Sequence, residues 1–238
     1  MTDLPRAPLP RVLQRVDAIW SPGGAAHHVL YGQSGAGKTT LVKALLGLCQ
    51  HERVLVLDPK PAADPVWDGP VDDPHLWGRP VASISPRFGY EGERGGGPIG
   101  MRYRLVGSPD RDGTARRFGE ALATVGAEGH CVLVLDDVRE ICRQLRLAEA
   151  VDSVMNLGRS ANVLAILCAT ETGWVSGRHQ GGMVWVGKTS GLEPAKAGAS
   201  LLGHSGKDWY TLTAAVAPHE WIFAEEQPGN HGPVLVAA

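Results

Sequence analysis

The sequence predicts an α/β fold in which a mostly parallel sheet is covered by helices on both faces. Short, continuous apolar runs alternate with segments of helical periodicity, and strands of that kind are buried on both faces. A glycine-rich segment separates the first such run from the first helical segment. The 238 residues, 43% of them hydrophobic, are enough for one large domain. We expect this domain to span residues 27–238, after an N-terminal extension, residues 1–26.

The same patterns predict the individual elements in chain order. The extension should contain a short amphipathic helix, because its apolar residues recur at helical spacing: Val12, Leu13, Val16, Ile19 and Trp20. Strands are expected at residues 27–31, 54–57, 101–106, 132–135, 163–168, 183–186 and 221–223. Helices are expected at residues 38–49, 114–125 and 149–158, and a further helical segment should carry Ile141, Leu145 and Leu147. Residues 61–100 are expected to be irregular, since proline, aspartate, tryptophan and glycine dominate them.

The glycine-rich segment, residues 32–39, matches the phosphate-binding P-loop G-x-x-x-x-G-K-[ST] and lies between a strand and a helix, as that motif requires. Glycines let the backbone bend around phosphates, and the helix N-terminus adds a positive dipole end. Lys38 should reach the β- and γ-phosphates of ATP, and the Thr39 hydroxyl should hold Mg²⁺. The predicted nucleotide-binding residues are Gly32, Gln33, Ser34, Gly35, Ala36, Gly37, Lys38, Thr39 and Thr40. Residues 27–238 are thus expected to be a single P-loop NTPase domain.

A second apolar run, residues 132–135, ends in two carboxylates and is typical of a Walker B motif. Asp136 should be the metal-side residue, and Asp137 should be the catalytic base that polarises the attacking water. Glu140, one helical turn further on, is a weaker candidate for the base. Two solvated acids at a strand end remain the alternative interpretation.

Three further segments resemble the FtsK/HerA superfamily of DNA-pumping ATPases. Residues 55–60 look like that superfamily's second strand, which often ends in Asp-Pro-Lys, and residues 157–163 are similar to its Gly-Arg-small-small turn. Residues 167–171 correspond to the strand end that usually reads Ala-Thr-Gln. The order and spacing agree over residues 27–175, and the tail agrees only loosely. The resemblance implies a RecA-like fold of the ASCE class.

The resemblance also implies roles for single residues. Arg159 corresponds to an arginine finger that reaches a neighbouring subunit's γ-phosphate, with a local structural role as the alternative. Glu171 stands where the superfamily has its γ-phosphate-sensing Gln, and a carboxylate there would repel phosphate, so Thr170 is an alternative sensor. Asp137 stands where most members have Glu, and the Asp–Asp pair resembles the viral packaging branch.

The partners that the resemblance implies are double-stranded DNA and further copies of the chain in a ring, a pentamer or hexamer. A capsid portal or vertex protein would be a third. Residues 86–104 are the candidate pore loop or, alternatively, a surface loop, and contain both cationic and aromatic side chains: Arg87, Phe88, Tyr90, Arg94, Arg102 and Arg104. The formal net charge of −2 argues against a protein that coats nucleic acid nonspecifically.

The function that the sequence predicts is an ATPase motor that packages a viral genome. A compact translocation core favours this over a cellular or plasmid translocase for conjugation or segregation. A small-molecule kinase and a nucleotide-gated adaptor stay open as non-motor alternatives. We expect no membrane insertion, no signal peptide and four free thiols, and hence a cytoplasmic protein, in the host cytoplasm or virion-associated if viral.

Overall fold

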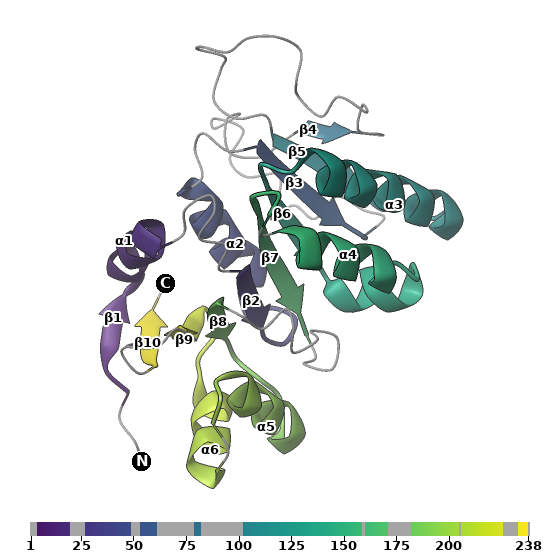
Figure 1. Cartoon of the computed structure of the whole chain (residues 1–238). Coiled ribbons are helices and arrows are strands. Elements are labelled where there is room, and N and C mark those ends of the chain that lie inside the picture. Colours follow the sequence, from purple (N-terminus) through teal and green to yellow (C-terminus); the bar gives the residue numbers. More distant parts are fainter. Residues whose placement is uncertain are drawn as a thin grey trace.

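The computed structural model describes residues 4–19, 27–48, 53–60, 79–81, 102–158, 160–170, 182–204, 206–225 and 233–237. Within them the strands form one sheet in the order β1-β10-β9-β8-β2-β7-β6-β3-β5-β4 (Figure 1). The strands are β1 (Arg6–Pro8), β2 (His27–Tyr31), β3 (Arg53–Asp58), β4 (Arg79–Val81), β5 (Arg102–Val106), β6 (Cys131–Asp136), β7 (Val163–Ala169), β8 (Gly182–Val186), β9 (Glu220–Glu225) and β10 (Val234–Ala237). The helices are α1 (Leu9–Ile19), α2 (Lys38–Gly47), α3 (Arg111–Glu128), the π-helical turn η1 (Glu140–Gln144), α4 (Ala148–Gly158), α5 (Leu192–Leu201) and α6 (Lys207–Ala215).

The centre of the sheet is parallel, as the continuous apolar strands predicted. Strand β2 pairs in parallel with β7 and β8, β6 pairs in parallel with β7 and β3, and β5 extends this array. Only the C-terminal side reverses direction, because β9 runs antiparallel to both β8 and β10 among the described strands. The P-loop strand β2 therefore lies inside the sheet, and its carboxyl end shares an edge with those of β6 and β7.

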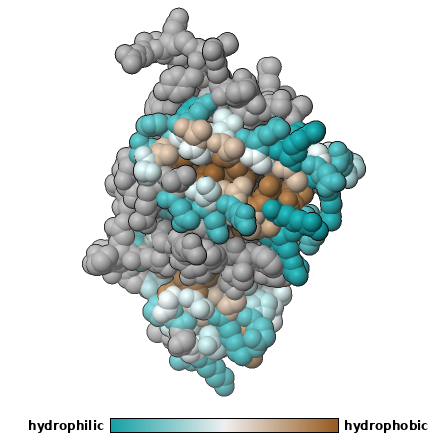
Figure 2. All heavy atoms as spheres, turned by 45° about the vertical axis from the view of Figure 1, so that its right-hand side comes forward, coloured by the Kyte–Doolittle hydropathy of each residue, from teal (hydrophilic) through white to brown (hydrophobic). Residues whose placement is uncertain are grey.

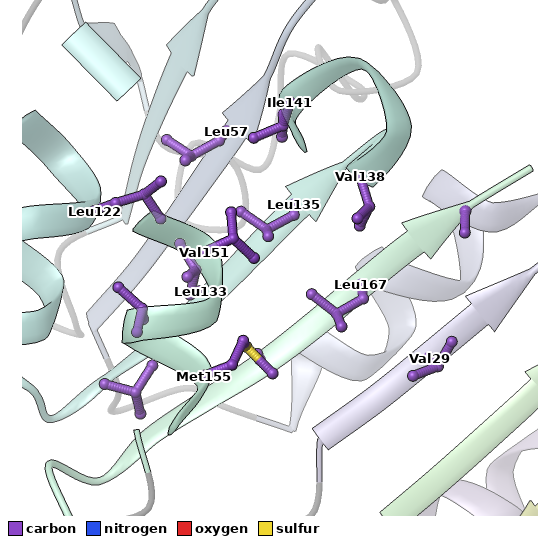
Figure 3. Close-up of a cluster of buried hydrophobic side chains, with 14 of the residues drawn as sticks. Val29, Leu57, Leu122, Leu133, Leu135, Val138, Ile141, Val151, Met155 and Leu167 are labelled. Carbon is purple, nitrogen blue, oxygen red and sulfur yellow. The ribbon is translucent and has the colours of Figure 1, made fainter. Parts of the chain in front are cut away.

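Helices cover the two faces of this sheet, and alternate strand residues bury into each (Figure 1). Leu133 and Leu135 of β6 pack on the face covered by α3, η1 and α4, as the close-up shows (Figure 3). The end of α5 belongs to the same buried cluster. Val132 and Val134 pack on the opposite face, which α1 and α2 cover. Burial on both faces explains why these strands are apolar at every position.

The described part of the N-terminal extension belongs to the same sheet and core. Strand β1 pairs in parallel with β10, and Val12 and Val16 of α1 are buried in one cluster with Trp185 and Val236. Strand β1 therefore forms the outer edge of the sheet, next to β10, and α1 packs into the core. Trp20 lies outside the described residues.

Several elements differ from the sequence expectations. The segment around Ile141 forms a single π-helical turn, η1, rather than a regular helix. Strand β4 lies within the region expected to be irregular, and the sequence patterns did not predict α5, α6 or β10. Helix α5 carries Pro194 in its first turn, where the backbone N–H has no partner within the helix and its absence costs nothing. Further along α5, Gly198 packs closely against Val186 and Tyr31. Such small, proline-containing helices give a weak periodic signal.

The face of the molecule drawn in Figure 2 is largely polar among the described residues. Figure 2 shows hydrophilic side chains around a limited hydrophobic area at the height of α3 and α4. Leu192 is the one large hydrophobic side chain of the described residues that is exposed. Cys131, Cys142 and Cys168 are free thiols, and Cys49 lies outside the described residues. The helices of the described part of the chain include none with the length and apolar character needed to cross a membrane.

His28 provides a pH-dependent stability test of this core. The side chain is fully buried in β2, and its Nδ1 accepts a hydrogen bond of 3.0 Å from the indole N–H of Trp185. Burial, with a smaller effect of His27, lowers the pKa of His28 from 6.5 to about 3. Between pH 6.5 and pH 3, His28 is therefore protonated in the unfolded chain and neutral in the folded chain. The folded state is favoured in full above pH 6.5, and this contribution to its stability is lost as the pH falls toward 3.

We expect the lowered pKa of His28 to reduce the unfolding free energy by about 2 kcal/mol at pH 5 relative to neutral pH. His28→Gln keeps an oxygen acceptor for Trp185 and removes the titrating group. Urea denaturation at pH 7.5 and pH 5 should give a smaller loss for His28→Gln than for the unaltered chain. Equal losses in the two proteins would contradict the assignment.

Candidate nucleotide-binding site

A pocket of about 510 Å³ lies at the carboxyl ends of β2, β6 and β7, within the usual size range of small-molecule sites. It is lined by Ser34, Gly35, Gly37, Lys38, Thr39, Thr40, Lys60, Asp136, Asp137, Cys168, Thr170 and His219. Residues of the P-loop and the two carboxylates at the end of β6 thus line one pocket. A groove of about 810 Å³ beside β1, α1 and β9 contains none of the predicted site residues.

The P-loop has the backbone shape that an anion site needs. Gly35 and Gly37 have φ of 78° and 91°, in the left-handed region that favours glycine. Helix α2 begins at Lys38 directly after Gly37, and no side chain of the described residues caps its N-terminus. Its first N–H groups and positive dipole end are therefore available for phosphate oxygens.

Lys38 folds back onto its own loop. Its Nζ donates to the carbonyl oxygens of Gly32 at 2.7 Å and Gln33 at 3.0 Å. Burial lowers the pKa of Lys38, and the nearby charges of Asp136 and Asp137 partly oppose that effect. The ammonium is thus held at the phosphate-binding loop, where phosphate oxygens can replace the two carbonyls.

The two Walker B carboxylates have different environments. Asp136 ends β6, is 4% exposed, and lies 3.7 Å from the ammonium of Lys60. Asp137 follows with a left-handed φ of 82°, and its Oδ1 accepts a hydrogen bond of 3.2 Å from the backbone N–H of Glu140. Asp137 lines the pocket, whereas Glu140 does not and lies 3.5 Å from Arg111. The geometry favours Asp137 over Glu140 as the base.

Asp58 is a carboxylate that the sequence analysis did not single out as a site residue. It is fully buried at the end of β3, and its Oδ1 accepts a hydrogen bond of 3.2 Å from the backbone N–H of Lys60. Burial, together with the nearby charge of Asp136, raises the pKa of Asp58 to about 6. Lys60 therefore links Asp58 and Asp136. The Asp-Pro-Lys sequence at the end of this strand is the signal that could have identified Asp58 as a site residue.

The residues present fit a magnesium ion. Thr39 and Asp136 both line the pocket, and Mg²⁺ commonly takes only one or two protein oxygens and completes its shell with phosphate and water. Within the described residues there is no group of three or more His, Cys, Asp or Glu side chains that could hold a metal. A metal at Asp136 would therefore depend on oxygens from a bound polyphosphate.

The remaining predicted residues divide into three groups. Thr170 follows β7 and lines the pocket, where a γ-phosphate sensor is expected. Arg159 and Glu171 lie outside the described residues, as do Arg87, Phe88, Tyr90 and Arg94 of the predicted pore loop. Arg102 belongs to β5, not to a loop.

The prediction that Arg104 faces DNA is wrong. Arg104 pairs with Val56 across β5 and β3 and is only 3% exposed. Its charge lies near Asp58 and lowers the pKa of that carboxyl, against the larger effect of burial. A guanidinium held inside the protein beside a buried carboxylate cannot reach a DNA backbone.

His219 is a pocket residue that the sequence analysis missed. It precedes β9, and its backbone N–H donates to Ala36 of the P-loop at 3.4 Å. Its ring lies against Gly37, since a Cβ placed on Gly37 would be 2.6 Å from the ring Nδ1. A lone histidine carries no motif, so only the tertiary structure shows its proximity to the P-loop.

The contact between Gly37 and His219 is testable by stability. Gly35→Ala adds a Cβ to a left-handed residue with no atom within 4 Å, so we expect a loss of about 1 kcal/mol in unfolding free energy. Gly37→Ala should lose about 1 kcal/mol more, because its Cβ would also overlap His219. Chemical denaturation of Gly37→Ala in a His219→Ala background should remove that excess. An excess that persists without the imidazole would place the clash elsewhere.

No protein-family model matches the sequence, and no curated protein matches it. Solved structures similar in fold include the genome packaging NTPase B204 from Sulfolobus turreted icosahedral virus 2 in complex with sulfate. That likeness has a TM-score of 0.60 at 12% identity and covers 91% of this chain and 97% of B204. Further B204 structures contain AMPPCP, AMP or ATP-γS.

Two further ATPases share the fold over part of their length. EssC from Geobacillus thermodenitrificans gives a TM-score of 0.54 at 11% identity, covering 88% of this chain and 38% of EssC. The type VII secretion ATPase EccC from Thermomonospora curvata gives 0.52 at 18% identity, covering 90% of this chain and 25% of EccC. These likenesses confirm the P-loop NTPase fold. The chain has the α/β fold of a P-loop ATPase.

Proposed function

We propose that this chain is an ATP-hydrolysing motor that translocates double-stranded DNA and packages a viral genome into a capsid. The observation that carries the proposal is the pocket that brings Lys38, Thr39, Asp136 and Asp137 together at one sheet edge. The likeness to B204 over nearly the full length of both chains supports the packaging role. ATP and Mg²⁺ are the proposed substrate and metal.

In this proposal each pocket residue has a distinct task. The P-loop N–H groups and Lys38 hold the β- and γ-phosphates, and Thr39 and Asp136 hold the metal. Mg²⁺, when bound, neutralises charge on the phosphates. Asp137 accepts the proton of the water that attacks the γ-phosphate, and Thr170 contacts that phosphate from the end of β7.

The motor part of the proposal needs a ring. We assign Arg159 as the finger that completes the neighbouring subunit's site, and we keep Glu171 as the alternative to Thr170 as sensor. A P-loop pocket alone also serves a kinase or a nucleotide-gated adaptor. A cellular or plasmid translocase would share all the proposed chemistry, and only the origin of its DNA would differ.

Asp137 and Glu140 can be separated by a matched pair of variants. Asp137→Asn keeps an oxygen that accepts from the Glu140 N–H, and Asn tolerates a left-handed φ, so the turn should stay intact. An amide cannot accept the proton from water, so kcat should fall about 10²–10⁴-fold while ATP still binds. Glu140→Gln should retain turnover. Measured ATPase rates with Lys38→Ala as the inactive reference check this, and the reverse pattern would make Glu140 the base.

Duplex DNA should stimulate ATP hydrolysis by assembled protein, and DNA affinity should fall steeply with salt because binding releases counterions from the phosphates. The measurement is steady-state turnover with and without duplex DNA, on size-fractionated protein and at several salt concentrations. The Lys38→Ala protein supplies the background rate. Turnover that duplex DNA leaves unchanged at every salt concentration would favour the kinase or adaptor alternatives.

A further inference from the structure

His219 is held against the P-loop by a tight turn before β9. Within that turn the Glu220 N–H donates to the Ala217 carbonyl at 3.1 Å, and the Ala217 N–H donates to Glu220 Oε2 at 3.2 Å. His219 itself has a φ of 63°, a left-handed conformation that costs a non-glycine residue of order 1 kcal/mol. The His219 N–H contact to Ala36 joins this turn to the P-loop across more than 180 residues of sequence.

Packing of the core does not require this imidazole. The His219 side chain is exposed, yet it lines the pocket beside Gly37. An exposed ring fixed over an anion-binding loop can donate an N–H to an anion. Its place in the pocket therefore points to contact with the ligand.

The sheet order defines which end of the ligand His219 meets. The strands run β9-β8-β2-β7-β6, with the P-loop after the central β2. Asp136, Asp137 and Thr170 lie at the ends of β6 and β7, on one side of the P-loop, and His219 precedes β9 on the other side. A γ-phosphate attacked by water at Asp137 must face β6 and β7. The nucleoside must then extend toward β8 and β9.

We propose that His219 binds the nucleoside end of the nucleotide, with an imidazole N–H that donates to the α-phosphate beside the ribose. This inference rests on the proposed function, because it takes the direction of the nucleotide from the role of Asp137. His219 is a binding residue that acts equally on ATP, ADP and AMP. It sets nucleotide affinity and takes no part in the attack on the γ-phosphate.

The test measures ADP and AMP binding by isothermal titration calorimetry, with no hydrolysis involved. His219→Ala should weaken both ligands about tenfold or more, the loss expected for a hydrogen bond to a charged group. His219→Gln keeps an N–H donor and should recover part of that affinity. His204→Ala is the matched control. The ring of His204 stacks on that of Trp209, with 4.0 Å between the ring centroids, and His204 does not line the pocket.

Steady-state kinetics supply a second readout. The KM for ATP should rise in His219→Ala by a factor similar to the loss in ADP affinity, while kcat is retained. Unchanged ADP and AMP affinity in His219→Ala, or a fall in kcat without a change in KM, would overturn the assignment. Failure of the unaltered protein to bind ADP, AMP or ATP would overturn the proposed function and this inference together. Binding by the unaltered protein with no effect of His219→Ala would overturn only the inference.

Discussion

The parallel register of β2, β7 and β6 is the constraint on which the rest of the site depends. Tyr31 pairs with Ala169, and Asp136 pairs with Cys168, so the three strands end at the same level. The P-loop, Asp137 and Thr170 follow directly after these ends. A slip of one residue would turn every buried side chain to the opposite face, where it would meet different neighbours, and close packing of the side chains on both faces therefore fixes the register. Core packing thus sets the distance from the P-loop to the carboxylates.

The aligned strand ends bring several charged side chains together, two of them buried carboxylates. Asp58, Asp136 and Asp137 gather beside Lys38 and Lys60, and the two most buried carboxylates share Lys60 as a neighbour. A buried carboxylate needs a compensating cation or a proton. Lys38 donates to backbone carbonyls, and Lys60 lies beside Asp136. Phosphate oxygens and a divalent cation would bring opposite charges to these same groups.

The sequence predicted the central strands well because a strand buried on both faces must be apolar at every position. It predicted the P-loop and the Walker B carboxylates because each is a local pattern at a strand end. The error at Arg104 has a local cause: residues 101–106 were expected to form a strand, yet the same arginine was assigned to a loop. His219 could not be predicted, because its contact with Gly37 depends on how β9 pairs with β8.

The C-terminal part of the chain closes the nucleotide pocket on the side away from the carboxylates. Strand β9 runs antiparallel to β8, with Ile222 paired to Val186, and this places the turn before β9 at the same sheet edge as the P-loop. In the proposed function, residues on the β6 and β7 side must match the geometry of water, metal and γ-phosphate. A residue at the nucleoside end must only contribute affinity, and many side chains can do that. The proposed roles would thus account for a resemblance to the FtsK/HerA superfamily that is clear around the carboxylates and only loose around His219.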